Sequence, residues 1–144
     1  MPTKSDLAAA YRATTYRVFL PGGPQDLRIG QASPELSAWL ADNEVDAWAV
    51  LTAWNPGSEK LSEQENVARQ SQLEVRLLEL GYEPFAGENL ADAGDWPAED
   101  TCFVGGMAAG EALAMAAGFG QAAIVVGGGD GTPKLMWTDG STDD

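Results

Sequence analysis

Side chains that donate and accept hydrogen bonds gather in one stretch, residues 52–69, directly after an apolar run of the sequence. They are Thr52, Asn55, Ser58, Asn66 and Arg69. In open α/β sheets, ligands bind beyond the carboxyl ends of strands, where loops meet helix N-termini. The free N–H groups and partial positive charge of such a terminus suit a phosphate or a carboxylate. We therefore expect this corner to bind a small anionic ligand.

Asn66 is the residue of this stretch that ordinary loop chemistry explains least. At about 100° per residue it lies on the same side of the expected helix as Leu73 and Leu77. A buried amide needs hydrogen-bond partners, which either the preceding loop or a ligand would supply. Arg69 either pairs with Glu65 one turn earlier or reaches over the corner as the main cationic partner of an anion.

A purely structural interpretation of the same corner stays open. The segment 55–58 (NPGS) has common turn chemistry, and Ser62 with Glu65 forms a capping box. Gln121 directly precedes the apolar run 122–126. It is expected either to cap a helix end or to line the same ligand site.

Histidine is absent and Cys102 is the single cysteine. Ser-His-Asp and Cys-His catalysis, imidazole metal ligands and a structural zinc site are therefore excluded. We assign no catalytic residue, and whether the protein is an enzyme stays open. The acidic residues within 86–100 lack EF-hand spacing, and the glycine-rich segments 104–111 and 127–133 lack the spacing of nucleotide-binding motifs. We expect no metal and no cofactor.

The charge balance is strongly acidic, because 22 Asp and Glu against eight Lys and Arg give a net charge of −14. Such a chain repels nucleic-acid phosphates and anionic membrane surfaces, so we expect direct contact with neither. An acidic surface keeps a protein soluble, and it also suits a basic protein partner. An acidic interaction module that engages or inhibits a basic partner is therefore the alternative to ligand binding.

The order of the expected elements predicts an α/β protein. Strands alternate with capped helices and no linker divides the chain, which indicates one domain over residues 1–144. We expect a sandwich with a mixed, largely buried sheet, helices packed on it, and antiparallel edge strands at both chain ends. Residues 1–4 and 138–144 are expected to be flexible. Because the chain has no apolar stretch of about 18 residues and no apolar block near residue 1, we expect a soluble, cytoplasmic protein.

Capping residues set the expected helix boundaries. Ser33, with Pro34 at the next position, begins one helix. Ser62 begins a longer helix that ends at Gly81. The apolar side chains on one half of the longer helix are expected to face the core. They are Val67, Leu73, Leu77, Leu78 and Leu80.

Two polar segments are expected to lie outside the regular structure. Residues 21–25 (PGGPQ) would connect the hairpin strands 15–20 and 26–30, as a loop too long for a two-residue turn. Residues 86–100 (AGENLADAGDWPAED) would form a long polar loop before the next strand.

Segments spread between Tyr11 and Trp137 carry a family resemblance. They include LRIGQASPEL, TAWNPGSEKLSEQENVARQSQLEVRLLELG, GDWPAED and FGQAAIVV. Together they resemble a family of small bacterial proteins described as a domain of unknown function (DUF3293). The most specific part is TAWNPGS, with Glu65, Asn66 and Arg69 behind it. The resemblance implies a stand-alone bacterial domain, and it supplies no catalytic residues.

We predict that the protein does not bind DNA or RNA at physiological salt. The reason is the net charge of −14 together with the lack of any basic block in the sequence. A gel-shift assay at about 150 mM salt should show no complex at micromolar protein. Sub-micromolar binding, in the range of a specific complex, would contradict the prediction.

Overall fold

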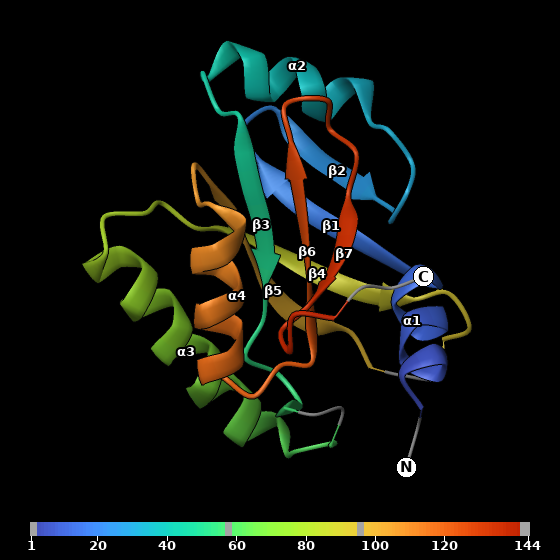
Figure 1. Cartoon of the computed structure of the whole chain (residues 1–144). Coiled ribbons are helices and arrows are strands. Elements are labelled where there is room, and N and C mark those ends of the chain that lie inside the picture. Colours follow the sequence, from blue (N-terminus) through green and yellow to red (C-terminus); the bar gives the residue numbers. More distant parts are fainter. Residues whose placement is uncertain (1–2, 57–58, 95–96, 142–144) are drawn as a thin grey trace.

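The computed structural model describes residues 3–56, 59–94 and 97–141. In these residues, four helices and seven strands follow one another (Figure 1). The helices are α1 (Lys4–Arg12), α2 (Pro34–Asp42), α3 (Glu63–Glu79) and α4 (Ala109–Gly118). The strands are β1 (Thr14–Leu20), β2 (Gly23–Leu27), β3 (Ala47–Leu51), β4 (Phe85–Ala91), β5 (Glu99–Gly105), β6 (Ala123–Gly128) and β7 (Lys134–Trp137). The α/β class is therefore confirmed.

The strands form one curled sheet in the order β2-β1-β4-β5-β3-β6-β7, shaped like half of a barrel (Figure 1). All neighbouring strands described in it are antiparallel, not mixed as expected. The reason is that α3 and α4 each connect two parallel strands that are not neighbours. In both cases one strand of opposite direction lies between them: β5 between β3 and β4, and β3 between β5 and β6. The expected antiparallel edges, β1–β2 and β6–β7, are confirmed.

Helices α3 and α4 cover the outer face of the sheet (Figure 1). Leu73 and Leu77 of α3 share one buried cluster with Ala112 and Ala116 of α4. The same cluster contains the outward-facing apolar side chains of β3, β5 and β6. These contacts fix α3 against β5, and they place the start of α3 beside the loop that follows β3.

The face of α3 that contacts the sheet is narrower than expected. Leu73 and Leu77 are buried as predicted, but the other three apolar residues of the predicted face are about half exposed. These are Val67, Leu78 and Leu80. Asn66 and Gln70 are buried in the same seam as the two leucines. Polar side chains therefore lie between this helix and the rest of the protein.

The inner face of the sheet holds a second core, which α2 covers. Trp48 of β3 stacks on Phe103 of β5 with ring centroids 5.5 Å apart. The Trp48 indole N–H donates to the Gly128 carbonyl at 2.9 Å. Leu36 and Leu40 of α2 are fully buried in this cluster. One end of the half-barrel is therefore filled by large side chains.

Helix α1 lies at the opposite end of the sheet from α2 (Figure 1). Its residue Ala8 packs on Ala123 of β6 and Trp137 of β7. The Tyr16 hydroxyl of β1 donates to the Tyr11 carbonyl of α1 at 3.2 Å. Helix α1 thus contacts β1 on one side of the curled sheet and β6 and β7 on the other. Between these strands it covers the inner face of the sheet.

The expected helix caps are present. Ser33 accepts a hydrogen bond from the Leu36 N–H at 3.1 Å, and Ser62 accepts one from the Glu65 N–H at 3.1 Å. Gly81, just after α3, has a φ of 92° that favours glycine. Along the described chain, no helix combines the length and apolar character needed to cross a membrane.

Both expected loops are shorter than predicted. Pro21 and Gly22 join β1 to β2. Gly22 has a φ of 103°, which suits the second central position of a type II turn. Strand β4 continues to Ala91 and β5 begins at Glu99, so residues 92–98 remain between them. Most of the expected long polar loop is therefore strand.

Arg28 anchors the β4–β5 connection. Its guanidinium binds both carboxylate oxygens of Asp92, at 2.9 and 2.7 Å, and also donates to Thr15 at 3.0 Å. These hydrogen bonds hold the pKa of Asp92 below its ordinary value. Among the described residues, no three Cys, Asp or Glu side chains are grouped as metal ligands. Asp92 therefore has a structural role, as the partner of Arg28.

Part of each chain end is held in place. Thr3 caps α1, and Lys4 pairs with Asp139 at 3.4 Å. The Thr138 N–H donates to the Ala122 carbonyl at 2.9 Å. Hydrogen bonds and an ion pair therefore connect these residues to the domain, and the flexibility expected of residues 1–4 and 138–144 stays a prediction. The outermost end residues lie outside the described part of the chain.

We predict that Gly127→Ala destabilises the fold by about 1–3 kcal/mol, as overpacking of a core does. A Cβ atom at Gly127 would overlap the buried Trp48 ring. Gly129→Ala is the matched control, because a Cβ there meets no atom within 4 Å. Urea unfolding monitored by circular dichroism should separate the two variants. Equal stability of both would contradict the account of how Trp48 is packed.

Candidate functional site

Asn55 and Asn66 join the loop after β3 to helix α3. The Asn66 side-chain oxygen accepts from the Asn55 backbone N–H at 2.9 Å, and the Asn66 amide donates to the Asn55 side-chain oxygen at 2.9 Å. Asn55 is 6% exposed and Asn66 is 2% exposed. The φ of Asn55 is 45°, in a region that Asn adopts more readily than most residues. The loop therefore supplies the partner that a buried Asn66 requires.

Asn55 also connects two other segments. Its side-chain oxygen accepts from the Leu61 N–H, just before α3, at 2.9 Å. Its amide nitrogen donates to the Glu99 carboxylate, at the start of β5, at 2.6 Å. Hydrogen bonds to a charged group are shorter and stronger than neutral ones. Asn55 therefore fixes the position of the Glu99 carboxylate relative to α3.

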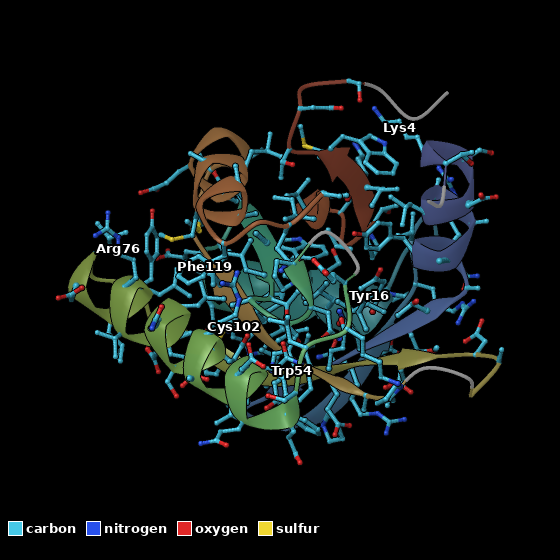
Figure 2. All side chains as sticks on the ribbon, turned by 90° about the horizontal axis from the view of Figure 1, so that it is seen from below. Lys4, Tyr16, Trp54, Arg76, Cys102 and Phe119 are labelled. Carbon is cyan, nitrogen blue, oxygen red and sulfur yellow. The ribbon has the colours of Figure 1, made fainter. Side chains whose placement is uncertain are left out.

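Two further side chains of α3 hold the same loop. The Gln70 side-chain oxygen accepts from the Ala53 N–H at 3.0 Å, and Arg69 Nε donates to the Ala53 carbonyl at 2.9 Å. Arg69 Nη2 also donates to the carbonyl of Phe119, which lies between α3 and α4 in Figure 2. The Arg69 guanidinium thus binds the backbone of two segments, and among the described residues it forms no ion pair with Glu65.

Thr52 and Gln121 hold the loop from its other side. The Thr52 hydroxyl donates to the Asp100 carbonyl at 2.7 Å and accepts from the Trp54 N–H at 3.1 Å. The Gln121 amide donates to the Trp54 carbonyl at 2.9 Å. Ser58 lies outside the described residues. The other five residues of the predicted site therefore meet at this loop.

A cavity of about 470 Å³ opens beside the loop, on the inner face of the sheet under α1. Thr52, Asn55 and Gln121 line it, whereas Asn66 and Arg69 lie behind the loop and do not. Most of the lining is apolar or aromatic. It includes Leu7, Tyr11, Tyr16, Val50, Trp54 and Ala123. In Figure 2, Tyr16 and Trp54 lie between α1 and α3.

Three residues that line the cavity each carry a buried polar atom with no hydrogen-bond partner among the described residues. The atoms are Asn89 Oδ1, Thr101 Oγ1 and Trp54 Nε1. Thr101 is 3% exposed. Buried polar groups in folded proteins nearly always have partners, so three residues of the cavity wall carry polar groups that the described protein leaves unsatisfied.

Sequence reasoning missed Asn89 because it assigned residues 86–100 to a loop, and it missed Thr101, the first residue of the strand expected after that loop. The signal that could have found Asn89 is the alternation of side chains from Phe85 to Ala91. In an antiparallel strand, every second side chain points to the same face. Asn89 shares its face with Phe85, which packs against the inner core.

The electrostatics of the cavity are set by Glu99, which lines it. All eight Lys and Arg residues belong to the described part of the chain, and none of them lines the cavity. Burial, and then the charge of Glu99, raise the pKa of Tyr11 to about 12. Burial raises the pKa of Tyr16 as well. Both phenols are therefore protonated at neutral pH, and the potential in the cavity favours cations over anions.

Cys102 belongs to the outer core and not to the cavity. It packs with the side chains that face α3 and α4, and the Gln70 amide donates to its sulfur at 3.5 Å. Burial is the largest influence that raises the pKa of Cys102 to about 12. A thiol that stays protonated at neutral pH is a poor nucleophile, so this cysteine is a core residue.

The model of one protein family matches residues 51–124, just over half of the chain. The chain belongs to this family, which is described as a protein of unknown function (DUF3293). The matched region contains Asn55, Asn66, Glu99 and Gln121, but it excludes α1 and Tyr16. No curated protein and no solved structure matches the chain significantly.

We predict that Asn66→Ala destabilises the protein by about 1–3 kcal/mol, because it leaves the buried backbone N–H of Asn55 without a partner and removes one of the hydrogen bonds to the Asn55 side-chain oxygen. Gln72→Ala is the control, since Gln72 is an exposed amide on the same helix, and exposed changes stay within about 0.5 kcal/mol. Urea unfolding gives both free energies. An Asn66→Ala protein as stable as wild type would show that the loop does not depend on this contact.

Proposed function

We propose that this protein binds a small, largely apolar molecule in the cavity between α1, the inner face of the sheet and the 52–55 loop. The observation that carries the proposal is a mostly apolar space lined by Asn89, Thr101 and Trp54, each of which carries a buried polar atom without a partner among the described residues. Ligand sites are typically hollows of about 300–1,000 Å³ with a few placed polar groups. The volume of about 470 Å³ lies within that range.

The charges around the cavity favour a neutral or cationic ligand. The anionic ligand expected at residues 52–69 stays a prediction, and its intended partner Arg69 is engaged by two backbone carbonyls. Glu99 supplies a carboxylate at the cavity wall, and no Lys or Arg of the described chain lines the cavity. An anion would therefore be bound against the local charge.

The alternative function, an acidic module for a basic partner, rests on the net charge of −14. Net charge acts first on solubility and association rates. An acidic interaction module does not explain the cavity or the three unpartnered polar atoms of the residues that line it. We therefore prefer small-molecule binding, and we assign no reaction.

The proposal predicts that a neutral apolar dye, N-phenylnaphthylamine, binds the protein with increased, blue-shifted fluorescence. Ala10→Trp should weaken binding by about tenfold or more, because Ala10 is an exposed residue of α1 that lines the cavity, and a large side chain there covers the opening. Ala9→Trp is the matched control, on an exposed neighbour that does not line it.

Two results would contradict the proposed function. The first is a wild-type protein that does not bind the dye. The second is equal binding by wild type and Ala10→Trp, which would place the dye elsewhere, for example on the exposed apolar side chains of α3 such as Val67 and Leu78. Both variants carry the same change from alanine to tryptophan on one helix, so a difference in helix propensity does not separate them.

A further inference from the structure

Three residues with oxygen-bearing side chains, on two neighbouring strands, line the cavity. Glu99 of β5 lies directly across from Asn89 of β4 in the strand register. Thr101 is two residues further along β5, and therefore on the same face. All three residues line the cavity, and Asn89 Oδ1 and Thr101 Oγ1 are buried without partners in the described chain. A group with several N–H donors would meet several acceptors here.

We infer that this part of the cavity takes the ammonium group of a small aromatic amine, an inference that rests on the cavity being a binding site. An ammonium has three N–H donors and no acceptor, which matches the oxygen atoms of Glu99, Asn89 and Thr101. Its charge pairs with the Glu99 carboxylate. The net charge of −14 also raises the local concentration of cations around the protein.

The carboxylate is held in place by the protein itself. Asn55 donates to Glu99 at 2.6 Å, and Asn55 is held by Asn66 and by the Leu61 N–H. A recognition group whose orientation is fixed by a second layer of hydrogen bonds loses little freedom when a ligand binds. The contacts that stabilise the loop therefore also orient the group that would select the ligand.

The rest of the cavity suits an aromatic ring. Tyr11, Tyr16 and Trp54 line it, and aromatic rings associate favourably in edge or offset geometry. The unpartnered Trp54 Nε1–H can donate to an oxygen on the ligand. Tyramine carries both an ammonium group and a phenol oxygen, so it serves as the probe.

The test compares tyramine with tyrosol and hydroxyphenylpropionate, which carry the same phenol ring but end in a hydroxyl or a carboxylate. Each compound competes with N-phenylnaphthylamine for the wild-type protein at neutral pH. We expect tyramine to displace the dye at concentrations about tenfold lower than tyrosol, because hydrogen bonds between charged groups are stronger than neutral ones. Hydroxyphenylpropionate should be the weakest of the three.

Glu99→Gln tests the role of the carboxylate, and its amide oxygen can still accept from Asn55. We expect it to remove the advantage of tyramine over tyrosol. Asp100→Asn is the matched control, because it makes the same charge change at an exposed neighbour that does not line the cavity. It should keep that advantage. Thermal unfolding shows whether each variant is folded. If Glu99→Gln does not fold, the displacement of the dye from the wild-type protein by the three phenols decides the inference on its own.

The outcomes separate this inference from the proposed function. Dye binding with equal displacement by the three phenols, or with a preference for the carboxylate, overturns the inference and leaves the cavity as a site for other ligands. The inference is overturned in the same way if Glu99→Gln keeps the full preference for tyramine, or if Asp100→Asn loses it. Failure of the dye and of all three phenols to bind overturns both.

Discussion

The paired amides of Asn55 and Asn66 are the constraint on which the rest of the site depends. Two hydrogen bonds of 2.9 Å lock a loop with a left-handed backbone onto the buried seam of α3. With Asn55 held there, its remaining amide nitrogen reaches Glu99 on β5. One pair of side chains therefore sets the start of a helix, the course of a loop and the position of a carboxylate. Polar residues in a helix seam cost little when every group is satisfied.

The cavity is a consequence of how the half-barrel is filled. Large side chains of the inner core, such as Trp48 and Phe103, occupy the end that α2 covers. At the other end the strands present smaller residues, including Ala91 and Ala123, and α1 closes over them. Protein interiors are normally packed as densely as organic crystals. A partly enclosed space of about 470 Å³ with polar atoms on its wall is therefore the feature of this fold that a bound molecule explains best.

Local signals in the sequence predicted the caps at Ser33 and Gly81, the buried strands and the inward orientation of Asn66. They could not predict that strands of opposite direction separate the parallel pairs, because the choice of sheet neighbours is not encoded locally. They also missed Asn89, since polar side chains on one face of a strand resemble those of a loop, and Thr101, since its place at the cavity depends on which strands are neighbours. The partner of Asn66 could not be predicted either, because it required the left-handed backbone of residue 55.

A crystal structure of the wild-type protein grown with tyramine tests the central claim most directly. We expect the ammonium nitrogen within hydrogen-bond distance of the Glu99 carboxylate, with Asn89 and Thr101 as its other partners, and the phenol ring beside Tyr16. The Asn55–Asn66 contact should be unchanged. Tyramine bound outside the cavity, or inside it with the ammonium turned away from Glu99, would contradict the account.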